Sequence, residues 1–230
     1  MMKYNFILGP VDTDSVSICK PDMSPFTEEE QEALINEINS IMPEKIKYAH
    51  DGYFKICVAI RAKNYILYDG KKITVKGSSL KASAKCHALK EMINEIIDLL
   101  CFEENEQVRN QKLVDLYNKY CKEVKNVTDI SRWSARRTIS AKTLESTRSN
   151  ETKIKDAIAG TNYVEGDRIR VFYKPDDSLC LVENFNGEYN KTRLLENIYD
   201  TTCVFETVLP VKELFVKYAL KKNQKLLEEL

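Results

Sequence analysis

The sequence from residue 6 to residue 18 reads Phe6-Ile7-Leu8-Gly9-Pro10-Val11-Asp12-Thr13-Asp14-Ser15-Val16-Ser17-Ile18. An apolar run enters this stretch, two carboxylates follow two residues apart, and an alternating apolar run leaves it. The pattern predicts a β-hairpin that carries Asp12 and Asp14 at its tip. If both residues are in strand geometry, their side chains point to the same face of the hairpin.

A divalent metal ion is one explanation for the two acids, because like charges held together are unfavourable unless a cation neutralises them. A solvated surface turn is the alternative, although apolar runs flank the pair on both sides. An EF-hand calcium loop does not fit. Counted from Asp12, Ser17 stands at the glycine position and Met23 at the bidentate glutamate position. Because the acids lie so near the first residue, we expect something to come before them.

The charges of the chain balance overall but are segregated locally. Its 230 residues carry 35 Lys and Arg against 35 Asp and Glu, and the composition suits one large globular domain or two small ones. Residues 21–44 contain seven acids and no Lys or Arg, whereas residues 61–90 contain eight Lys or Arg and one acid, Asp69. This asymmetry indicates a surface that faces a polyanion.

The seven cysteines are scattered and include no C-x-x-C spacing. They predict free thiols in a reducing cytoplasm and do not favour a zinc or iron–sulfur site. No stretch approaches the roughly 20 apolar residues of a membrane span, and the first residues lack the layout of a signal peptide. We therefore expect a cytoplasmic protein with no membrane partner.

The first part of the chain predicts an acidic helix followed by antiparallel strands. Thr27 and Glu30 form a capping box that opens a helix ending near Met42. Turn signals at Asp51-Gly52 and Asp69-Gly70 separate apolar runs. The runs predict strands at residues 46–49, 53–60, 65–68 and 72–76. We expect the Asp12/Asp14 hairpin to join this sheet.

The hydrophobic period becomes helical from about residue 82. It predicts one helix to about residue 100 and a second over residues 104–125. Residues 126–160 are polar and weakly periodic, which favours loops and short helices. The remaining expected elements are strands at 167–173 and 179–183 and a helix from about 200 to 230.

The predicted fold class is therefore α+β. Residues 1–85 would form an antiparallel sheet with a flanking helix, and residues 86–230 a mostly helical domain with a small β-hairpin.

A run of cations lies within and just after the predicted sheet. Its members are Arg61, Lys63, Lys71, Lys72, Lys76, Lys81 and Lys85. Cations spaced along strands, with Gly77 where the backbone can approach a ligand closely, suit contacts to a phosphate backbone. Tyr65 can lie against a sugar or a base edge. The alternative is a solvated lysine face on an ordinary sheet.

Arg132, Arg136 and Arg137 surround Trp133 and form a smaller basic patch. It suits phosphate contact with stacking, and equally a loop anchored by one buried Trp. No P-loop, Rossmann glycine pattern or serine elbow is present, and neither His50 nor His87 belongs to a metal or triad pattern. Metal-assisted phosphoryl transfer is the chemistry that remains.

Taken in order, these motifs resemble the C-terminal part of a family B DNA polymerase, most of all the replicative polymerases of tailed bacteriophages. Asp12-Thr13-Asp14-Ser15 resembles the Y-G-D-T-D-S palm hairpin, and Lys63-Asn64-Tyr65 the end of the K-K-R-Y element. Lys76-Gly77 resembles the palm-to-thumb transition. Ala157–Gly160 and Val164–Ile169 resemble the thumb stretch that precedes a V-x-G-[DE]-[RK]-[VI] strand.

Three positions depart from the family pattern. Pro10-Val11 replaces Tyr-Gly before the acids, Ala62 replaces the first Lys of K-K-R-Y, and Ser79 stands where an acid is common.

The resemblance implies that residues 1–85 end a polymerase palm and that residues 86–230 form a thumb. Asp14 would ligate the catalytic Mg²⁺ ions directly, with Asp12 as the supporting carboxylate. Lys63 and Tyr65 would contact the primer end. The other residues expected to contact DNA are Thr13, Ser15, Arg61, Lys76, Gly77, Lys81, Lys85, Arg132, Arg136 and Arg137.

The family's exonuclease domain, first palm segment and fingers cannot fit before Asp12. Because two-metal catalysis needs carboxylates on both sides of the metals, the resemblance implies a split DNA-directed DNA polymerase completed by a separately encoded N-terminal polypeptide. Its substrates would be primer–template DNA and deoxynucleoside triphosphates, in the host cytoplasm if the protein is viral. A sliding clamp is a further candidate partner.

Two other classes of protein remain open. One is a non-catalytic DNA-binding accessory protein or inactive polymerase fragment, which would keep the basic face without completing the acids. The other is a two-metal nuclease, which has less support because no further cluster of acids or histidines accompanies the pair.

Overall fold

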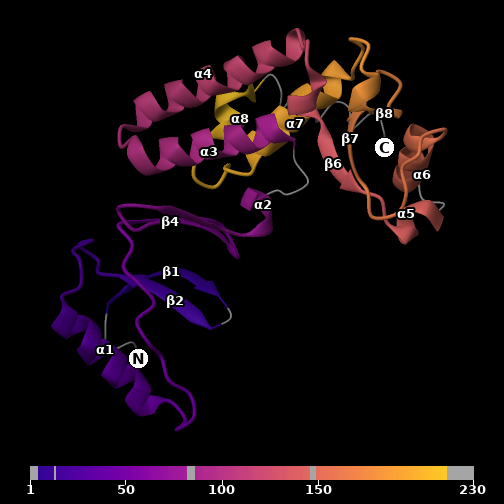
Figure 1. Cartoon of the computed structure of the whole chain (residues 1–230). Coiled ribbons are helices and arrows are strands. Elements are labelled where there is room, and N and C mark those ends of the chain that lie inside the picture. Colours follow the sequence, from indigo (N-terminus) through magenta and orange to yellow (C-terminus); the bar gives the residue numbers. More distant parts are fainter. Residues whose placement is uncertain (1–4, 13, 82–85, 146–148, 217–230) are drawn as a thin grey trace, which may run out of the picture. The chain divides into compact units, whose positions relative to one another are not determined.

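The computed structural model describes residues 5–12, 14–81, 86–145 and 149–216. Contacts divide the chain into two compact units, Met1–Gly77 (unit 1) and Ser78–Leu230 (unit 2). Helices combine with three small antiparallel sheets, which confirms the predicted α+β class (Figure 1). The assignment of residues 1–85 to a palm and 86–230 to a thumb stays a prediction.

Unit 1 begins with a two-stranded hairpin, β1 (Ile7–Asp12) and β2 (Ser15–Cys19). Val11 pairs with Val16 and Asp12 with Ser15, and the register shifts between Leu8 and Val11. The hairpin forms a sheet of its own, so the prediction that it joins the following strands is wrong. Pro10 offers no N–H and stands in the irregular part of β1, which makes that strand a poor partner for another.

Helix α1 (Glu28–Ile41) confirms the predicted capping box. The Glu30 backbone N–H donates to Thr27 Oγ1 over 3.2 Å, and the Thr27 N–H donates to Glu30 Oε2 over 2.8 Å. Lys20 Nζ lies 2.6 Å from the same Glu30 oxygen, which ties the chain after β2 to the start of the helix.

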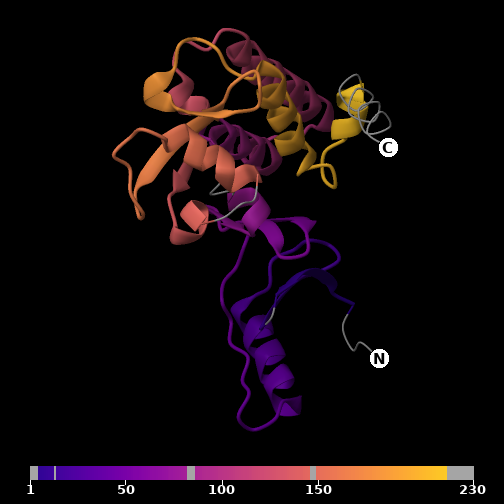
Figure 2. The same cartoon turned by 90° about the vertical axis from the view of Figure 1, so that its right-hand side faces the viewer.

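The chain after α1 runs back along the helix in extended form (Figure 2). The Asn39 side-chain amide donates to the Tyr48 carbonyl over 2.9 Å, and Asn39 Oδ1 accepts from the Tyr48 N–H over 2.7 Å. These bonds occupy the backbone groups that a neighbouring strand would use. The predicted strand at 46–49 and hairpin turn at Asp51-Gly52 are therefore wrong.

Strands β3 (Ile56–Arg61), β4 (Asn64–Tyr68) and β5 (Ile73–Lys76) form the second sheet, with β4 at its centre. The Asp69 carboxylate accepts from the N–H groups of Lys71 and Lys72, each over 2.7 Å, which confirms the hairpin turn at Asp69-Gly70. These backbone bonds lower the pKa of Asp69.

Unit 2 is built on two long helices that lie side by side, α3 (His87–Phe102) and α4 (Glu106–Lys125) (Figure 1). The short helix α2 (Ser78–Lys81) precedes them. Helix α7 (Lys191–Cys203) packs against both, and α8 (Val211–Leu214) follows. The predicted helices ending near 100 and spanning 104–125 are confirmed.

The helix expected from residue 200 is misplaced. Asn190 Oδ1 accepts from the Arg193 N–H over 2.9 Å and caps α7 ten residues earlier, and α7 ends at Cys203. The expected helix after residue 216 lies outside the described residues.

A three-stranded sheet completes unit 2. Its strands are β6 (Ala135–Thr138), β7 (Arg168–Tyr173) and β8 (Leu179–Leu181), with β7 in the middle. The remaining elements are the 3-10 turns η1 (Ile130–Trp133) and η2 (Val182–Asn184) and the helices α5 (Ala141–Glu145) and α6 (Ser149–Ile158). Strand β6 was not predicted, because Ala-Arg-Arg-Thr lacks apolar alternation.

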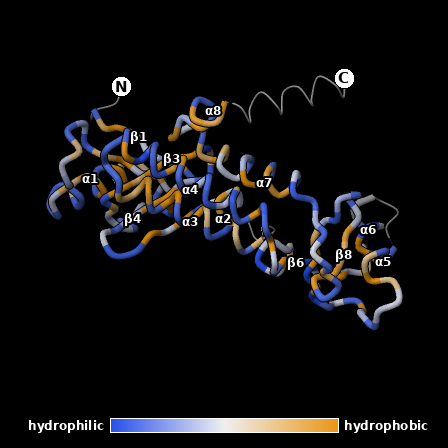
Figure 3. The backbone as a smooth tube through the Cα atoms, turned by 90° about the horizontal axis from the view of Figure 1, so that it is seen from above, coloured by the Kyte–Doolittle hydropathy of each residue, from blue (hydrophilic) through white to orange (hydrophobic). Residues whose placement is uncertain are grey.

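One face of this sheet is covered by α6. Ile154 and Ile158 of the helix meet Ile169 and Val171 of β7 and Leu181 of β8 in a buried cluster. In Figure 3, hydrophobic residues recur along these elements and along the strands of unit 1. No helix within the described ranges is long and apolar enough to cross a membrane. All seven cysteines are free thiols.

A buried tyrosine joins the end of α4 to the segment before α7. The Tyr189 hydroxyl donates to the Val124 carbonyl over 2.7 Å and accepts from the Val127 N–H over 3.1 Å. We expect Tyr189→Phe to lower the free energy of unfolding in urea by about 1–3 kcal/mol, because both backbone groups lose their partner.

Tyr163→Phe is the matched control, because the exposed Tyr163 hydroxyl donates only to the Glu183 carboxylate, over 2.8 Å. Its effect should stay within about 0.5 kcal/mol. Equal losses in the two variants would show that Tyr189 does not pin the end of α4.

Candidate functional site

The two acids of the hairpin differ in their backbone setting. Asp12 is the last residue of β1, whereas Asp14 lies in the turn before β2. Strand alternation therefore does not align the two side chains, and the condition for a shared strand face is not met. Thr13 lies outside the described residues, and Ser15 is exposed at the start of β2.

Lys63 lies next to Asp12, with Nζ 3.7 Å from Oδ1. It occupies the tight turn between β3 and β4, after Arg61 at the exposed end of β3. Its φ of 58° is in the left-handed region, which costs a non-glycine residue roughly 1–2 kcal/mol. The turn thus holds a cationic side chain beside the hairpin acid at a conformational cost.

Tyr65 and Lys76 are direct cross-strand partners on β4 and β5, so their side chains share one face of the sheet. Tyr65 is buried, and burial is the main cause that raises the pKa of its hydroxyl. The negative charges of Asp12 and Asp14 raise that pKa further. The electrostatic coupling indicates that this face lies close to the acids.

Gly77 packs its backbone against the turn that carries Lys63. Its φ is 102°, and a Cβ at this position would lie 2.3 Å from Asn64 Oδ1 and 2.5 Å from the Lys63 carbonyl oxygen. Asn64 is itself buried, and its Nδ2 donates to the Ala62 carbonyl over 3.0 Å. Gly77 thus approaches the chain's own turn closely, and the predicted close approach of its backbone to a ligand stays a prediction.

Asn64 is the residue at this site that sequence reasoning passed over. A polar residue at the start of a run of apolar strand residues is a signal that could have identified it, because a buried amide needs partners. The two stretches Lys63-Asn64-Tyr65 and Lys76-Gly77 are thereby brought together in unit 1.

The metal-binding capacity of these residues is limited. Mg²⁺ takes six oxygen ligands in octahedral geometry, of which one or two are usually protein carboxylates and the rest are water or substrate oxygens. Asp12 and Asp14 can supply one side of such a site. The described ranges contain no group of three or more His, Cys, Asp or Glu placed to hold a metal ion.

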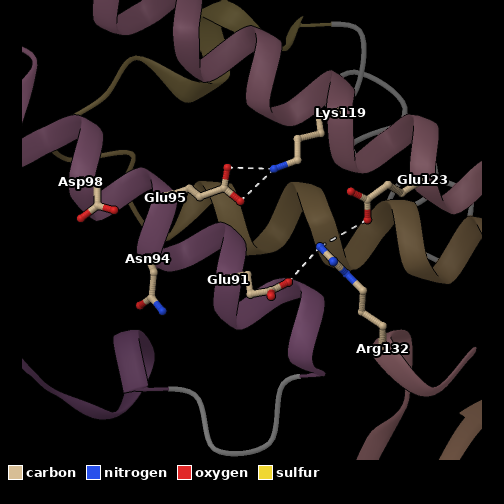
Figure 4. A pocket seen from close by; sticks show the side chains of 7 residues that line it. All are labelled: Glu91, Asn94, Glu95, Asp98, Lys119, Glu123 and Arg132. Carbon is tan, nitrogen blue, oxygen red and sulfur yellow. Dashed lines mark hydrogen bonds and ion pairs between the residues drawn. The ribbon is translucent and has the colours of Figure 1, made fainter.

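Arg132 is engaged within unit 2. Figure 4 shows its guanidinium between carboxylates of α3 and α4, with Nη2 2.8 Å from Glu91 and 3.4 Å from Glu123. Trp133 is buried and makes an edge contact with Tyr120, at a centroid distance of 6.2 Å. This geometry favours the anchored-loop interpretation, and phosphate contact by Arg132 stays a prediction.

The polar pocket in Figure 4 contains a second set of pairs. Lys119 Nζ lies 3.0 Å from the Glu95 carboxylate, and the Tyr120 hydroxyl donates to Glu95 Oε1 over 2.6 Å. Burial and this carboxylate raise the pKa of Tyr120, so the phenol stays a hydrogen-bond donor. The pairs link α3 to α4.

Arg136 and Arg137, two of the other predicted contacts, do not line this pocket. Arg136 and Arg137 are neighbours on β6 and are both exposed. Lys81 ends α2, and its side chain, like the whole of Lys85, lies outside the described residues.

No protein-family profile matches the sequence, and no curated protein matches it. Solved structures do match. The family B DNA polymerase from the hyperthermophilic archaeon Pyrobaculum calidifontis is similar over 77% of this chain, with a TM-score of 0.59 and 11% sequence identity. The matched region is 24% of that polymerase. At this identity the likeness shows a shared fold.

The packing of Gly77 gives a testable prediction. Gly77→Ala should lower the free energy of unfolding by about 2–4 kcal/mol, because the left-handed backbone strain adds to a collision with Asn64 and the Lys63 carbonyl. Urea unfolding followed by circular dichroism would measure the change.

Gly160→Ala is the matched control, because Gly160 also has positive φ but has no atom within 4 Å of its Cβ position. It should cost about 1 kcal/mol. If the two variants unfold alike, the close contact at Gly77 does not hold the Lys63 turn.

Proposed function

We propose that this chain is the C-terminal polypeptide of a split, family B type DNA-directed DNA polymerase. The observation that carries the proposal is the cluster of Asp12, Lys63, Tyr65 and Lys76 in a fold similar to part of such a polymerase. The sequence motifs and the fold similarity are separate observations, and both favour the same class of protein.

Within this proposal the residues divide into two tasks. Asp14 and Asp12 hold one side of the metal site, and Lys63, Tyr65 and Lys76 hold the end of the primer and its duplex. Bound Mg²⁺ would lower the pKa of the primer 3′-hydroxyl and stabilise the pyrophosphate leaving group. The ammonium of Lys63 keeps the Asp12 carboxylate charge balanced until a metal and DNA arrive.

The small core of unit 1 supports the need for a partner. Among its described residues, the buried hydrophobic side chains are Ile60, Tyr65, Ile66 and Leu67, all in β3 and β4. The hairpin β1–β2 instead exposes Ile7, Leu8, Val11 and Val16. A two-stranded hairpin is marginal in water, and apolar side chains on it are stabilised when another segment covers them.

The free edge of β2 is where such a segment could add a strand. In such an extended sheet β1 would remain the outer strand. Pro10 suits that position because it has no backbone N–H to donate to a further strand. Strand β2 has no proline between Ser15 and Cys19, and among the described strands it pairs with β1 alone. An N-terminal polypeptide adding a strand there would bring further carboxylates to the side of the site that Asp12 and Asp14 leave open.

Primer extension tests the catalytic part of the proposal. The chain alone should extend no primer with Mg²⁺ and nucleotides, whereas the chain co-purified with the polypeptide encoded upstream should extend it. In that complex, Asp14→Asn should reduce extension at least about 10³-fold, because the metal loses a charged ligand, and duplex binding should stay unchanged.

Asp22→Asn is the control, because the Asp22 carboxylate is exposed and bonds only to Ser24. Extension by the unaided chain would reject the split polymerase. Full extension by the Asp14→Asn complex would reject the metal site and favour a DNA-binding accessory protein.

A separate experiment tests the hairpin as the partner's docking site. Val16 is 43% exposed in β2, so Val16→Lys should leave the stability of the isolated chain within about 0.5 kcal/mol. It should abolish co-purification with the upstream polypeptide, because the lysine would be buried in the joint sheet.

Val108→Lys is the matched control for Val16→Lys, because Val108 is 42% exposed but lies on α4 in unit 2. Retention of the partner by the Val16 variant, or equal loss in both variants, would place the docking surface elsewhere.

A further inference from the structure

Three arginines share one face of the sheet in unit 2. Arg136 of β6 is the direct cross-strand partner of Arg170 on β7, and Thr138 is the partner of Arg168. Because paired residues point to the same side of a sheet, the guanidinium groups of Arg136, Arg168 and Arg170 lie on one face. All three residues are exposed.

The opposite face is fixed by the core. Ile169 and Val171 alternate with the arginines along β7 and are buried against α6. A one-residue slip would bury the charges, so the register holds the arginines on the open side. The assignment of the face therefore rests on packing and strand pairing together.

Among the described residues, the three arginines of this face have no counter-ion, unlike Arg132 and Arg193 of the same unit. Arg132 is paired with two glutamates, and Arg193 stacks on Tyr173 at 3.6 Å and pairs with Asp177 at 3.3 Å. No ion pair within the described part of the chain involves Arg136, Arg168 or Arg170.

Asp129 is an acid that Arg170 attracts electrostatically, and its carboxylate is already engaged. It accepts hydrogen bonds from the Ser131 N–H and hydroxyl, over 2.8 and 2.7 Å. These bonds are the main cause of its lowered pKa, and Arg170 contributes a smaller attraction. The face therefore keeps a net positive charge.

Like charges on directly opposite residues destabilise a sheet, so the Arg136 and Arg170 pair carries a cost in the free chain. A bound polyanion removes that cost. Guanidinium groups match phosphate oxygens with two parallel hydrogen bonds, and an exposed row of them suits an extended ligand better than a small enclosed anion. Farther along β7 the same face is closed, because Phe172 is buried and makes an edge contact with Phe185.

We infer that Arg136, Arg168 and Arg170 form a second nucleic-acid surface, which binds backbone phosphates of duplex DNA independently of the hairpin acids. The choice of DNA as the polyanion rests on the proposed function. Arg168 and Arg170 extend the set of predicted contacts. Arg137 points to the other face of the sheet, and its contact with DNA stays a separate prediction.

The test uses the full chain and a fluorescently labelled blunt duplex, without nucleotides, Mg²⁺ or a partner polypeptide. Anisotropy titrations over a series of salt concentrations give the affinity and its salt dependence. Each of Arg136→Gln, Arg168→Gln and Arg170→Gln should weaken binding several-fold and reduce the slope of log K against log salt by about 1. The triple variant should reduce this slope by about 3.

Lys122→Gln is the control, because Lys122 is exposed in the last turn of α4 and is not among the predicted DNA contacts. It should leave the slope unchanged. Thermal unfolding in low salt adds a readout that a structural role would not produce. Arg170→Gln should unfold at the same or a higher temperature, because the repulsion from Arg136 is relieved.

The inference is overturned if the wild-type chain does not bind the duplex, if the triple variant keeps the wild-type slope, or if Lys122→Gln has the same effect as the arginine variants. Loss of binding to poly-L-glutamate with unchanged DNA binding would also overturn it and indicate an acidic protein partner. Primer extension by the assembled polymerase is a separate measurement, so failure here leaves the proposed function standing, and the reverse also holds.

Discussion

The contact between Asn64 and the backbone of Gly77 is the constraint on which the site in unit 1 depends. The Asn64 amide bonds to the Ala62 carbonyl, and its oxygen fills the space that a side chain at residue 77 would need. This packing closes the β3–β4 turn, which holds Lys63 beside Asp12. In the adjoining strands Tyr65 lies opposite Lys76, so the buried Asn64 amide lies between the turn of Lys63 and the strand pair of Tyr65 and Lys76.

Unit 1 combines this well-packed turn with a hairpin that has little core of its own. The buried hydrophobic side chains lie in β3 and β4, while the β1–β2 hairpin leaves apolar side chains in water. An isolated protein gains stability by covering such groups, so their exposure next to the acids is informative. The exposed apolar side chains and the two acids therefore occur on the same hairpin.

The arginines of unit 2 show the limit of what local sequence can reveal. Arg132, Arg136 and Arg137 looked alike because they cluster around Trp133. Folding separates them, with Arg132 turned into a polar pocket between α3 and α4 and Arg136 and Arg137 on opposite faces of β6. Arg170, more than thirty residues later, becomes the partner of Arg136, because β7 returns beside β6 after two short helices.

Local sequence determined the elements whose signals are short-range. The capping box of α1, the Asp69-Gly70 turn and the long amphipathic helices follow from side chains within a few residues of each other. The strand expected at 46–49 failed because Asn39, on a separate element, occupies the backbone of Tyr48. Strand β6 was missed because its neighbour β7, rather than its own composition, makes it a strand.

The sequence by itself determined which residues are candidates for a site: the two acids of the hairpin, the basic stretch after them and the glycine at residue 77. Only the tertiary structure decided which of these meet, since the distance between Lys63 and Asp12 and the close packing at Gly77 depend on strand pairing between distant segments. It also decided which charges stay available, because an ion pair such as that of Arg132 forms between separate elements. Side-chain type is a local property, whereas proximity and desolvation are properties of the folded chain.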